Sequence, residues 1–269
     1  MDNAYKKSSF ASAFFFLPRR EREALSAVYA FCRTADDIVD DGHKNAQERL
    51  NALRGELDNI YANAPQTKPG KALRQALKNY PVPKRYFSDL LDGMQRDLQT
   101  PVRYATLQDL EWYLYRAAGV VGLMCIEIFG YKNPQSRQYA AALGSAVQLT
   151  NIARDIGQDA KINRIYLPKE YLQKFNVSER EILTLRDNKN TRALARCFAQ
   201  LAQERYNKAR ALLPKEDFAA LFPARVMGNV YEALLKKFLT GTCAINGKKL
   251  KLNKLQKIIT LLKTRGERP

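Results

Sequence analysis

Apolar residues recur at a helical spacing along almost the whole chain, and this feature limits the fold more than any other. They return every three or four positions, whereas the strict apolar–polar alternation typical of strands is scarce. Pro18 suits the first turn of a helix that runs to about Asp41. Further helices are predicted over 46–62, 70–79, 84–97, 107–129, 134–158, 168–174, 178–185, 190–213, 216–240 and 250–264.

The breaks between these helices are short. APQTKPG at 64–70, RDNKN at 186–190 and Pro214 interrupt the pattern, but none resembles a long linker, and no repeat of fixed period is present. With 46% hydrophobic residues, the 269-residue chain has ample material for a core. We therefore predict one all-α domain that spans residues 1–269.

Cysteine and histidine usage excludes several classes of site. The four cysteines are far apart and form no CxxC pair: Cys32, Cys125, Cys197 and Cys243. Disulfides and structural zinc are therefore not expected, and a cytoplasmic location fits best. The single histidine, His43, also excludes histidine-based catalytic triads and HExxH metal sites.

Charge is distributed unevenly along the sequence. The chain carries 45 Lys and Arg against 27 Asp and Glu, a formal net charge of +18. This excess favours anionic partners such as nucleic acid, acidic lipid surfaces or phosphorylated substrates. Yet the stretch YAFCRTADDIVDD at 29–41 gathers four aspartates at the end of an apolar segment.

A helical reading divides these aspartates into two pairs. At about 100° per residue, spacings of four, three and four place one set on a narrow stripe beside the apolar face. That stripe consists of Tyr29, Arg33, Asp36 and Asp40. Asp37 and Asp41 turn away from it and are expected to face solvent.

A second polar stripe appears in AVQLTNIARDIGQD at 146–159. Spacings of three, four and four align Gln148, Asn151, Asp155 and Asp159. Two solvated helix faces would explain both stripes, because like charges one turn apart cost only a few tenths of a kcal/mol.

Two such stripes in one helical protein, each with an arginine within a turn, favour a functional reading. Buried carboxylates must be neutralised, and no lysine lies in either stripe. Mg²⁺ prefers carboxylate oxygens and is commonly completed by substrate phosphates. We expect Mg²⁺ to bridge the stripes to a diphosphate, with Arg33, Arg154 and Arg164 at its outer oxygens.

Four stretches in order resemble the squalene and phytoene synthase family, the head-to-head prenyl diphosphate synthases. They are SFASAFFFLP at 9–18, YAFCRTADDIVDD at 29–41, YLYRAAGVVG at 113–122 and QLTNIARDIGQDAKINRIYLP at 148–168. The likeness covers nearly the whole chain. LLDGMQRDL at 90–98 and the basic carboxyl-terminal third are most similar to the bacterial presqualene diphosphate synthases of hopanoid pathways.

The resemblance implies an isoprenoid-synthase helical bundle around a central apolar cavity, with the following roles by motif. The metal ligands would be Asp36, Asp40, Asp155 and Asp159, supported by Asn151 and Gln148. The residues that contact diphosphate or orient the reacting groups would be Tyr29, Arg33, Arg154, Arg164 and Tyr166. Ser9 and Phe10 match a flap within residues 1–18, and the cavity would be lined by Tyr113, Ala117 and Gly122.

Two positions depart from the family pattern. Gln158 stands where the family often has an acid, and Asn163 where glycine commonly precedes the arginine. Neither change removes an expected ligand.

The resemblance implies a Mg²⁺-dependent condensation, with Mn²⁺ as an alternative ion, of two farnesyl diphosphates to presqualene diphosphate. NADPH is not expected for this first half-reaction, and no G-x-G-x-x-G follows a strand. Phytoene, dehydrosqualene or squalene synthesis and a degenerate farnesyl diphosphatase remain alternatives.

The segment 248–269 forms a basic amphipathic tail. Leu252, Leu255, Ile259 and Leu262 recur at helical spacing among lysines, so this helix either docks on the domain or rests on an anionic membrane surface. A basic nucleic-acid-binding module is the rival from another class. It leaves both aspartate stripes unexplained, so no nucleic acid partner is expected.

Overall fold

The computed structural model describes residues 17–40, 44–99, 101–246 and 250–269. Within these ranges no strand is formed, and the one β-type pairing is an isolated bridge between Val102 and Arg164. The helices are α2 (Arg19–Asp40), α3 (Ala46–Tyr61), α4 (Lys68–Asn79), α5 (Lys84–Asp97), α6 (Leu107–Leu114), η2 (Tyr115–Gly119), α7 (Val120–Phe129), α8 (Ser136–Lys161), α9 (Lys169–Lys174), α10 (Glu179–Leu183), α11 (Lys189–Leu212), η3 (Lys215–Asp217), α12 (Phe222–Thr240) and α13 (Lys254–Gly266). The all-α prediction is confirmed, and most predicted helix ends lie within four residues of the observed ones. The helix predicted from 216 was placed wrongly at its start, because the short turn η3 precedes it and α12 begins only at Phe222.

Local hydrogen bonds start several of these helices. Thr106 begins α6 by accepting the backbone N–H of Asp109 at 3.2 Å, while the Asp109 carboxylate accepts the N–H of Thr106 at 3.0 Å. Such reciprocal caps satisfy amide groups that have no partner inside the helix. At the other end of this helical stretch, Gly130 stops α7 with a φ of +79°, which glycine adopts without strain.

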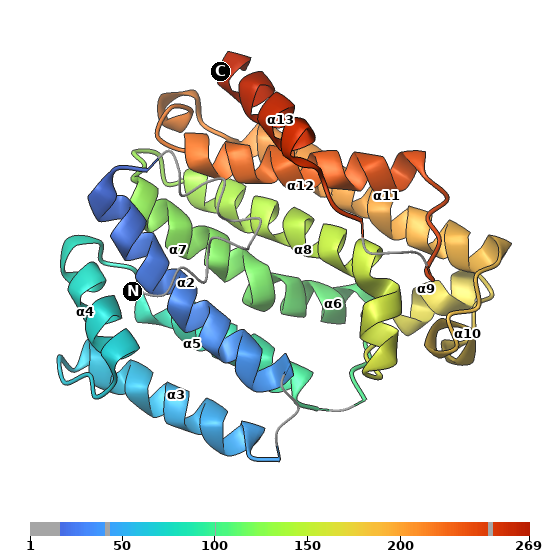
Figure 1. The fold of residues 1–269 in the computed structure, drawn as a ribbon, viewed down its shortest axis with the longest axis horizontal. Coiled ribbons are helices and arrows are strands. Elements are labelled where there is room, and N and C mark those ends of the chain that lie inside the picture. Colours follow the sequence, from blue (N-terminus) through green and yellow to red (C-terminus); the bar gives the residue numbers. More distant parts are fainter. Residues whose placement is uncertain (1–16, 41–43, 100, 247–249) are drawn as a thin grey trace.

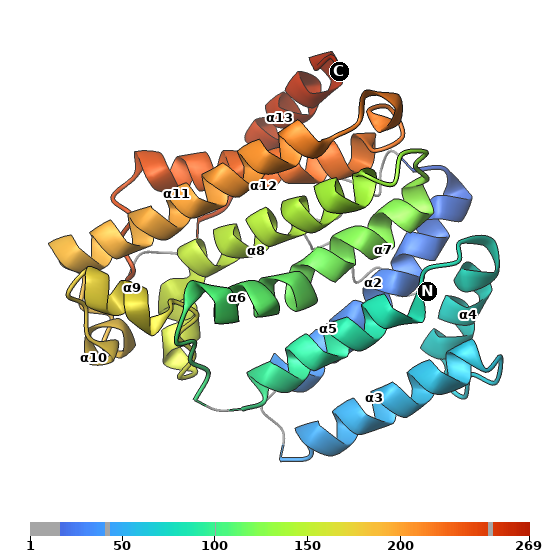
Figure 2. The same cartoon turned by 180° about the vertical axis from the view of Figure 1, so that it is seen from behind.

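The long helix α8 lies at the centre of the molecule. It packs against α11, α7, α12 and η2, while α2 crosses the other side of the bundle against α4, α5 and α7. Figures 1 and 2 show α3 and α4 at one edge and α13 at the opposite edge. The two aspartate-bearing helices, α2 and α8, are thus both internal elements of one layered bundle.

Two glycines bring α8 unusually close to the helix formed by η2 and α7. A Cβ on Gly144 would lie 2.3 Å from the carbonyl oxygen of Ala118, and one on Gly122 would lie 2.4 Å from that of Ala140. No side chain fits at such distances, so glycine sets the helix separation here. Gly122 was predicted to line a cavity, and the structure gives it this packing role as well.

One continuous apolar core runs from Leu17 to Ile245. The stretch Leu107–Phe129 is long and apolar enough to cross a membrane by length and composition, but half of its most apolar window is buried inside the protein. Because this stretch packs against α5 and α8, the protein interior accounts for its apolarity.

Candidate active site

The carboxyl-terminal halves of α2 and α8 carry the two predicted aspartate stripes, and Arg164 links them. Its Nη1 donates to Asp40 Oδ1 at 2.9 Å, and its Nη2 donates to the Val39 carbonyl oxygen at 3.1 Å. The guanidinium thus joins the segment after α8 to the end of α2, across 124 positions of sequence. The Arg164 side chain is only 12% exposed, whereas that of Asp40 is 51% exposed, so the link runs from the protein interior to its surface.

The loop that carries Arg164 is held in place by hydrogen bonds to the segment at Val102 and Arg103. Ile165 N–H donates to the Val102 carbonyl oxygen at 3.1 Å, and Arg103 donates to Asn163 O at 2.8 Å and Oδ1 at 2.9 Å. Asn163 has a φ of +59°, in the left-handed region. Asparagine tolerates this conformation better than most residues, which explains why it can stand where the family commonly has glycine.

Arginines pair with a carboxylate of each stripe. Arg154 Nε donates to Asp155 Oδ1 at 2.7 Å, its Nη2 pairs with the second oxygen, and the side chains are only 12% and 13% exposed. Arg33 donates to Asp36 Oδ2 at 3.4 Å and also pairs with Asp37. Each stripe therefore combines acidic groups with planar guanidinium donors suited to phosphate oxygens.

Burial, followed by repulsion from Asp40, raises the pKa of Asp36 from 3.8 to about 6, and the nearby Arg33 only partly opposes this. Burial and the neighbouring Asp40 therefore disfavour the ionised form of Asp36 more than Arg33 stabilises it. That is the electrostatic condition in which a hard cation binds favourably.

Asp36 was expected to point inward and Asp37 to face solvent. The two side chains differ in whether they line the cavity, but not in how much of their surface is exposed. The Asp36 and Asp37 side chains are 50% and 43% exposed, so equal accessibility replaces the predicted difference. Asp36 nevertheless lines the central cavity, whereas Asp37 does not. Asp41, which was expected to face solvent, lies outside the described residues.

A cavity of about 300 Å³ lies between α2, α5, α7, α8 and α12. Its polar wall consists of Tyr29, Arg33, Asp36, Gln148, Asn151 and Tyr231. Its apolar wall includes Leu90, Met94, Val121, Ile126, Leu143 and Met227. From Ala140 to Asn151 the lining follows α8 for about 16 Å at about 1.5 Å per residue, so the cavity changes from apolar to polar along that helix.

A π-helical turn, η2, shapes one wall of this cavity. Ala117 lines it, as predicted from the YLYRAAGVVG stretch, and so does Ala118. A π-helical turn inside an α-helix commonly accompanies a functional site, because the extra residue redirects the side chains after it. The small side chains at this turn leave the space open.

An aromatic cluster with a buried carboxylate adjoins the polar end. Tyr113 OH donates to Asp97 Oδ2 at 2.8 Å and lies 3.4 Å from Tyr166 OH. The Tyr104, Tyr113 and Tyr166 rings pack with centroids 5.2 to 6.1 Å apart. Burial raises the pKa of Asp97 to about 6, although the Tyr113 hydrogen bond and the charge of Arg164 lower it.

The structure brings most of the predicted residues together, although by different routes. The predicted residues that line the cavity are Tyr29, Arg33, Asp36, Tyr113, Ala117, Gly122, Gln148 and Asn151. Tyr166 joins through the aromatic cluster, and Asp40 through Arg164. Arg154, Asp155 and Asp159 lie on the same helix as Gln148 and Asn151 but are not among the residues that line the cavity, so their expected place beside Asp36 stays a prediction. Ser9 and Phe10, the predicted flap, lie outside the described residues.

Sequence reasoning missed Asp97, Tyr104 and Tyr231. Asp97 lies within LLDGMQRDL, five positions after Asp92, and that spacing puts the two carboxylates on different faces of a helix, so no stripe marks it. Tyr231 reaches the cavity from α12, far from every motif in the sequence. Their places beside the cavity and the aromatic cluster become visible only once α5, α12 and the loop before α6 are packed together.

The carboxylates present fit a hard divalent ion shared with a ligand. Within the described ranges, no three acidic, histidine or cysteine side chains lie close enough together to hold a metal alone. Mg²⁺ is usually bound by one or two carboxylates and completed by waters and substrate phosphates. An aspartate pair on each helix therefore suits an ion that arrives with a diphosphate.

Comparisons with known proteins match this arrangement. The squalene/phytoene synthase family model matches residues 4–256. The presqualene diphosphate synthase of Zymomonas mobilis is 35% identical over 266 residues, covering 96% of this chain and 89% of that protein. The 15-cis-phytoene synthase of Synechococcus elongatus is 34% identical, covering 81% and 75%. A crystal structure of a dehydrosqualene synthase in complex with ligand has a TM-score of 0.88 at 30% identity, covering 98% of this chain and 93% of that one.

Proposed function

The chain belongs to the squalene/phytoene synthase family of prenyltransferases, which condense prenyl diphosphates head to head, and we propose that it converts two farnesyl diphosphates into presqualene diphosphate. The C1–O bond of the donor breaks and releases diphosphate. The C2=C3 double bond of the acceptor then attacks the donor C1, which forms the C1–C2 bond and leaves a cation at C3. Loss of a proton from the donor C1 supplies the electron pair for the C1–C3 bond and closes the cyclopropane. No reductant is consumed.

The observation that carries the proposal is the polarity gradient of the cavity. Leu90, Val121 and Leu143 suit the prenyl chains, whereas Arg33 and Asp36 stand where a diphosphate would lie. An apolar enclosure also protects an allylic cation from water, which would otherwise capture it as an alcohol. The full-length similarity to the Zymomonas mobilis presqualene diphosphate synthase supports the choice of product.

Mg²⁺ fits the acidic residues, and Mn²⁺ shares its preference for oxygen donors. Asp36 and Asp40 on α2, and Asp155 and Asp159 on α8, would hold the ion, with Asn151 in support. When bound, the ion offsets the charge of the diphosphate and so makes it a better leaving group.

The arginines of the site would orient the diphosphate. Arg154 and Arg164 are held in place by carboxylates and are largely buried, so little side-chain entropy is lost when they donate to phosphate oxygens. Such preorganised donors stabilise charge that develops as the C1–O bond breaks.

Product analysis tests the proposal. The purified protein is incubated separately with farnesyl diphosphate and with geranylgeranyl diphosphate, in the presence of Mg²⁺ and with or without NADPH, and products are identified by mass spectrometry. Presqualene diphosphate formed without NADPH is the expected result. Four other outcomes would contradict the proposal. Dehydrosqualene would indicate a dehydrosqualene synthase, and squalene that requires NADPH a squalene synthase. Farnesol alone would indicate a diphosphatase, and phytoene formed only from geranylgeranyl diphosphate a phytoene synthase.

A matched pair of variants tests the first aspartate stripe. Asp36→Asn should lower kcat by about 100-fold or more, since it removes a charge that faces the cavity. Asp37→Asn changes the neighbouring residue, which is similarly exposed but does not line the cavity, and should retain activity. Asp155→Asn tests the second stripe in the same way. Equal activity of the Asp36 and Asp37 variants would contradict the assigned role.

A further inference from the structure

Helix α13 exposes four of its five large apolar side chains, with Leu261 partly buried, and buries a small polar one. Leu255 and Leu262 are 64% and 62% exposed, Ile258 and Ile259 are 52% and 42% exposed, and Thr264 is fully buried. At about 100° per residue, the four apolar side chains lie within an arc of about 100°, opposite Thr264. A helix docked by the hydrophobic effect would present the reverse arrangement.

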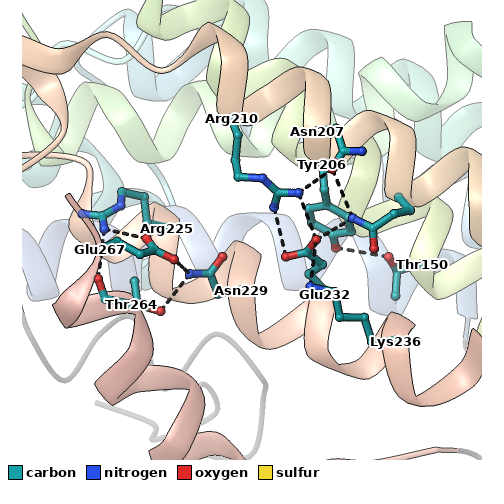
Figure 3. Close-up of polar contacts among 11 residues, drawn as sticks. Thr150, Tyr206, Asn207, Arg210, Arg225, Asn229, Glu232, Lys236, Thr264 and Glu267 are labelled. Atoms are coloured by element: carbon teal, nitrogen blue, oxygen red, sulfur yellow. Dashed lines mark hydrogen bonds and ion pairs between the residues drawn. The ribbon is translucent and has the colours of Figure 1, made fainter. Parts of the chain in front are cut away.

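This orientation is held by a network of polar contacts (Figure 3). Arg225 Nη2 donates to the Thr264 carbonyl oxygen at 3.0 Å and to Glu267 Oε2 at 2.6 Å. Asn229 Nδ2 donates to Thr264 Oγ1 at 2.9 Å and to Glu267 Oε1 at 2.7 Å. Because Arg225 is itself only 7% exposed, these bonds fix the end of α13 on α12. These hydrogen bonds therefore hold α13 with its apolar face directed outward. We define the apolar face as Leu255, Ile258, Ile259 and Leu262.

The apolar face is also concentrated on one element. Four of the seven large apolar side chains that are exposed in the described part of the chain lie on α13. The others are Trp112, Ile162 and Leu183, on separate elements. Scattered apolar residues need no explanation, whereas a contiguous group of this kind marks an interaction surface.

Cations border this apolar face on both sides. On a helical projection, Lys254 and Arg265 lie along one edge and Lys263 along the other, and all three are exposed. The α13 sequence, KLQKIITLLKTRG, contains no acidic residue. A helix with a narrow apolar strip between basic edges is suited to the bilayer interface, where apolar side chains contact acyl chains and cations contact anionic headgroups.

We infer that α13 lies in the interface of an anionic lipid bilayer, with its apolar face among the acyl chains and its basic edges at the headgroup phosphates. A second copy of this chain is a poorer partner, because a two-fold contact would bring the same basic edges together. The position of α13 at the edge of the molecule opposite α3 and α4 leaves it free to meet a flat surface (Figures 1 and 2). Membrane docking does not depend on which prenyl product is made.

Vesicle sedimentation of the full chain tests this inference without substrate or metal. Phosphatidylcholine vesicles alone are compared with vesicles containing about one third phosphatidylglycerol, at low and high salt. The double variant Leu255→Asn, Leu262→Asn removes apolar surface. Its matched control is Ile162→Asn, Leu183→Asn, which changes two exposed apolar residues elsewhere. All variants alter exposed side chains, and far-UV circular dichroism checks that they fold.

Charge is tested in parallel by Lys254→Gln, Lys263→Gln, with Lys68→Gln, Lys71→Gln on α4 as the control. We expect salt-sensitive binding to the anionic vesicles, weakened about tenfold or more by either α13 pair and unchanged by either control. Absence of binding, or equal losses in variant and control, would overturn the inference. So would sedimentation velocity that shows a wild-type dimer converted to monomer by the α13 apolar variant, since a second copy would then cover this face.

Discussion

Asp97→Asn is expected to change how the stability of the fold depends on pH. Asp97 is 5% exposed, its Oδ2 accepts from Tyr113, and its Oδ1 finds no donor among the described residues. Burial raises its pKa from 3.8 to about 6. The folded state therefore holds this proton more tightly than the unfolded state does, so the fold loses stability as pH rises through this window.

The magnitude follows from the two pKa values. The full penalty, reached above about pH 6, is about 3 kcal/mol at about 1.4 kcal/mol per unit of pKa. About 1.4 kcal/mol of this penalty develops between about pH 5 and pH 8. Asparagine has no such dependence. Between about pH 5 and pH 8, the free energy of unfolding of the variant should therefore rise by about 1.4 kcal/mol relative to that of the wild type. A constant cost of the buried amide would shift the variant equally at every pH and would not change this difference.

Urea denaturation followed by far-UV circular dichroism at several pH values measures this difference. Tyr113→Phe serves as a second variant, because it removes the donor to Oδ2 and should raise the pKa of Asp97 further, extending the window upward. Parallel stability curves for the wild type and Asp97→Asn would refute the reasoning, since they would mean that folding does not change the titration of this carboxyl.

Three other predictions concern packing, pH and specificity. Gly144→Ala should lower the free energy of unfolding by about 2 kcal/mol, because its Cβ would lie 2.3 Å from a facing backbone carbonyl oxygen. Gly55→Ala, with nothing within 4 Å, should raise it by about 0.5–1 kcal/mol; thermal unfolding that moves both in one direction would contradict this. Because burial and Asp40 raise the pKa of Asp36 to about 6 in the metal-free protein, protons should compete with Mg²⁺ for this carboxylate, and the Mg²⁺ concentration that gives half-maximal turnover should rise as the pH falls below about 6. A constant Mg²⁺ requirement down to about pH 4 would argue against the raised pKa. Leu143 lines both this cavity and a neighbouring one of about 440 Å³. Leu143→Ala should therefore raise the kcat/KM ratio of geranylgeranyl to farnesyl diphosphate by about tenfold, and an unchanged ratio would exclude it as the wall that limits chain length.

The helices and both aspartate stripes could be predicted because the geometry of a helix is local. A fixed rotation per residue puts Asp36 and Asp40 on one stripe, and Gln148, Asn151 and Asp155 on another, whatever packs around them. The family motifs have the same local character. For this reason most predicted helix ends agree with the structure, and the residues predicted to line a cavity, Tyr113, Ala117 and Gly122, do line one.

Contacts between distant segments could not be read in this way. The pKa of Asp97 depends on how completely α6 and the loop before it bury the end of α5, and burial is not written in the spacing of one helix. Similarly, the bond from Arg164 to Asp40 requires the loop after α8 to meet the end of α2. Periodicity in the tail predicted an amphipathic helix but not which face it would present.

The sequence by itself determined the all-α class, the two acidic stripes and the basic tail, because each depends on residue type and on a repeat of a few positions. Tertiary structure alone decided that Asp36 faces a cavity while Asp37 does not, and that α13 docks through Thr264 and leaves Leu255 exposed. The physical reason is that burial, and with it pKa and partner choice, is a property of how helices meet and not of any helix alone.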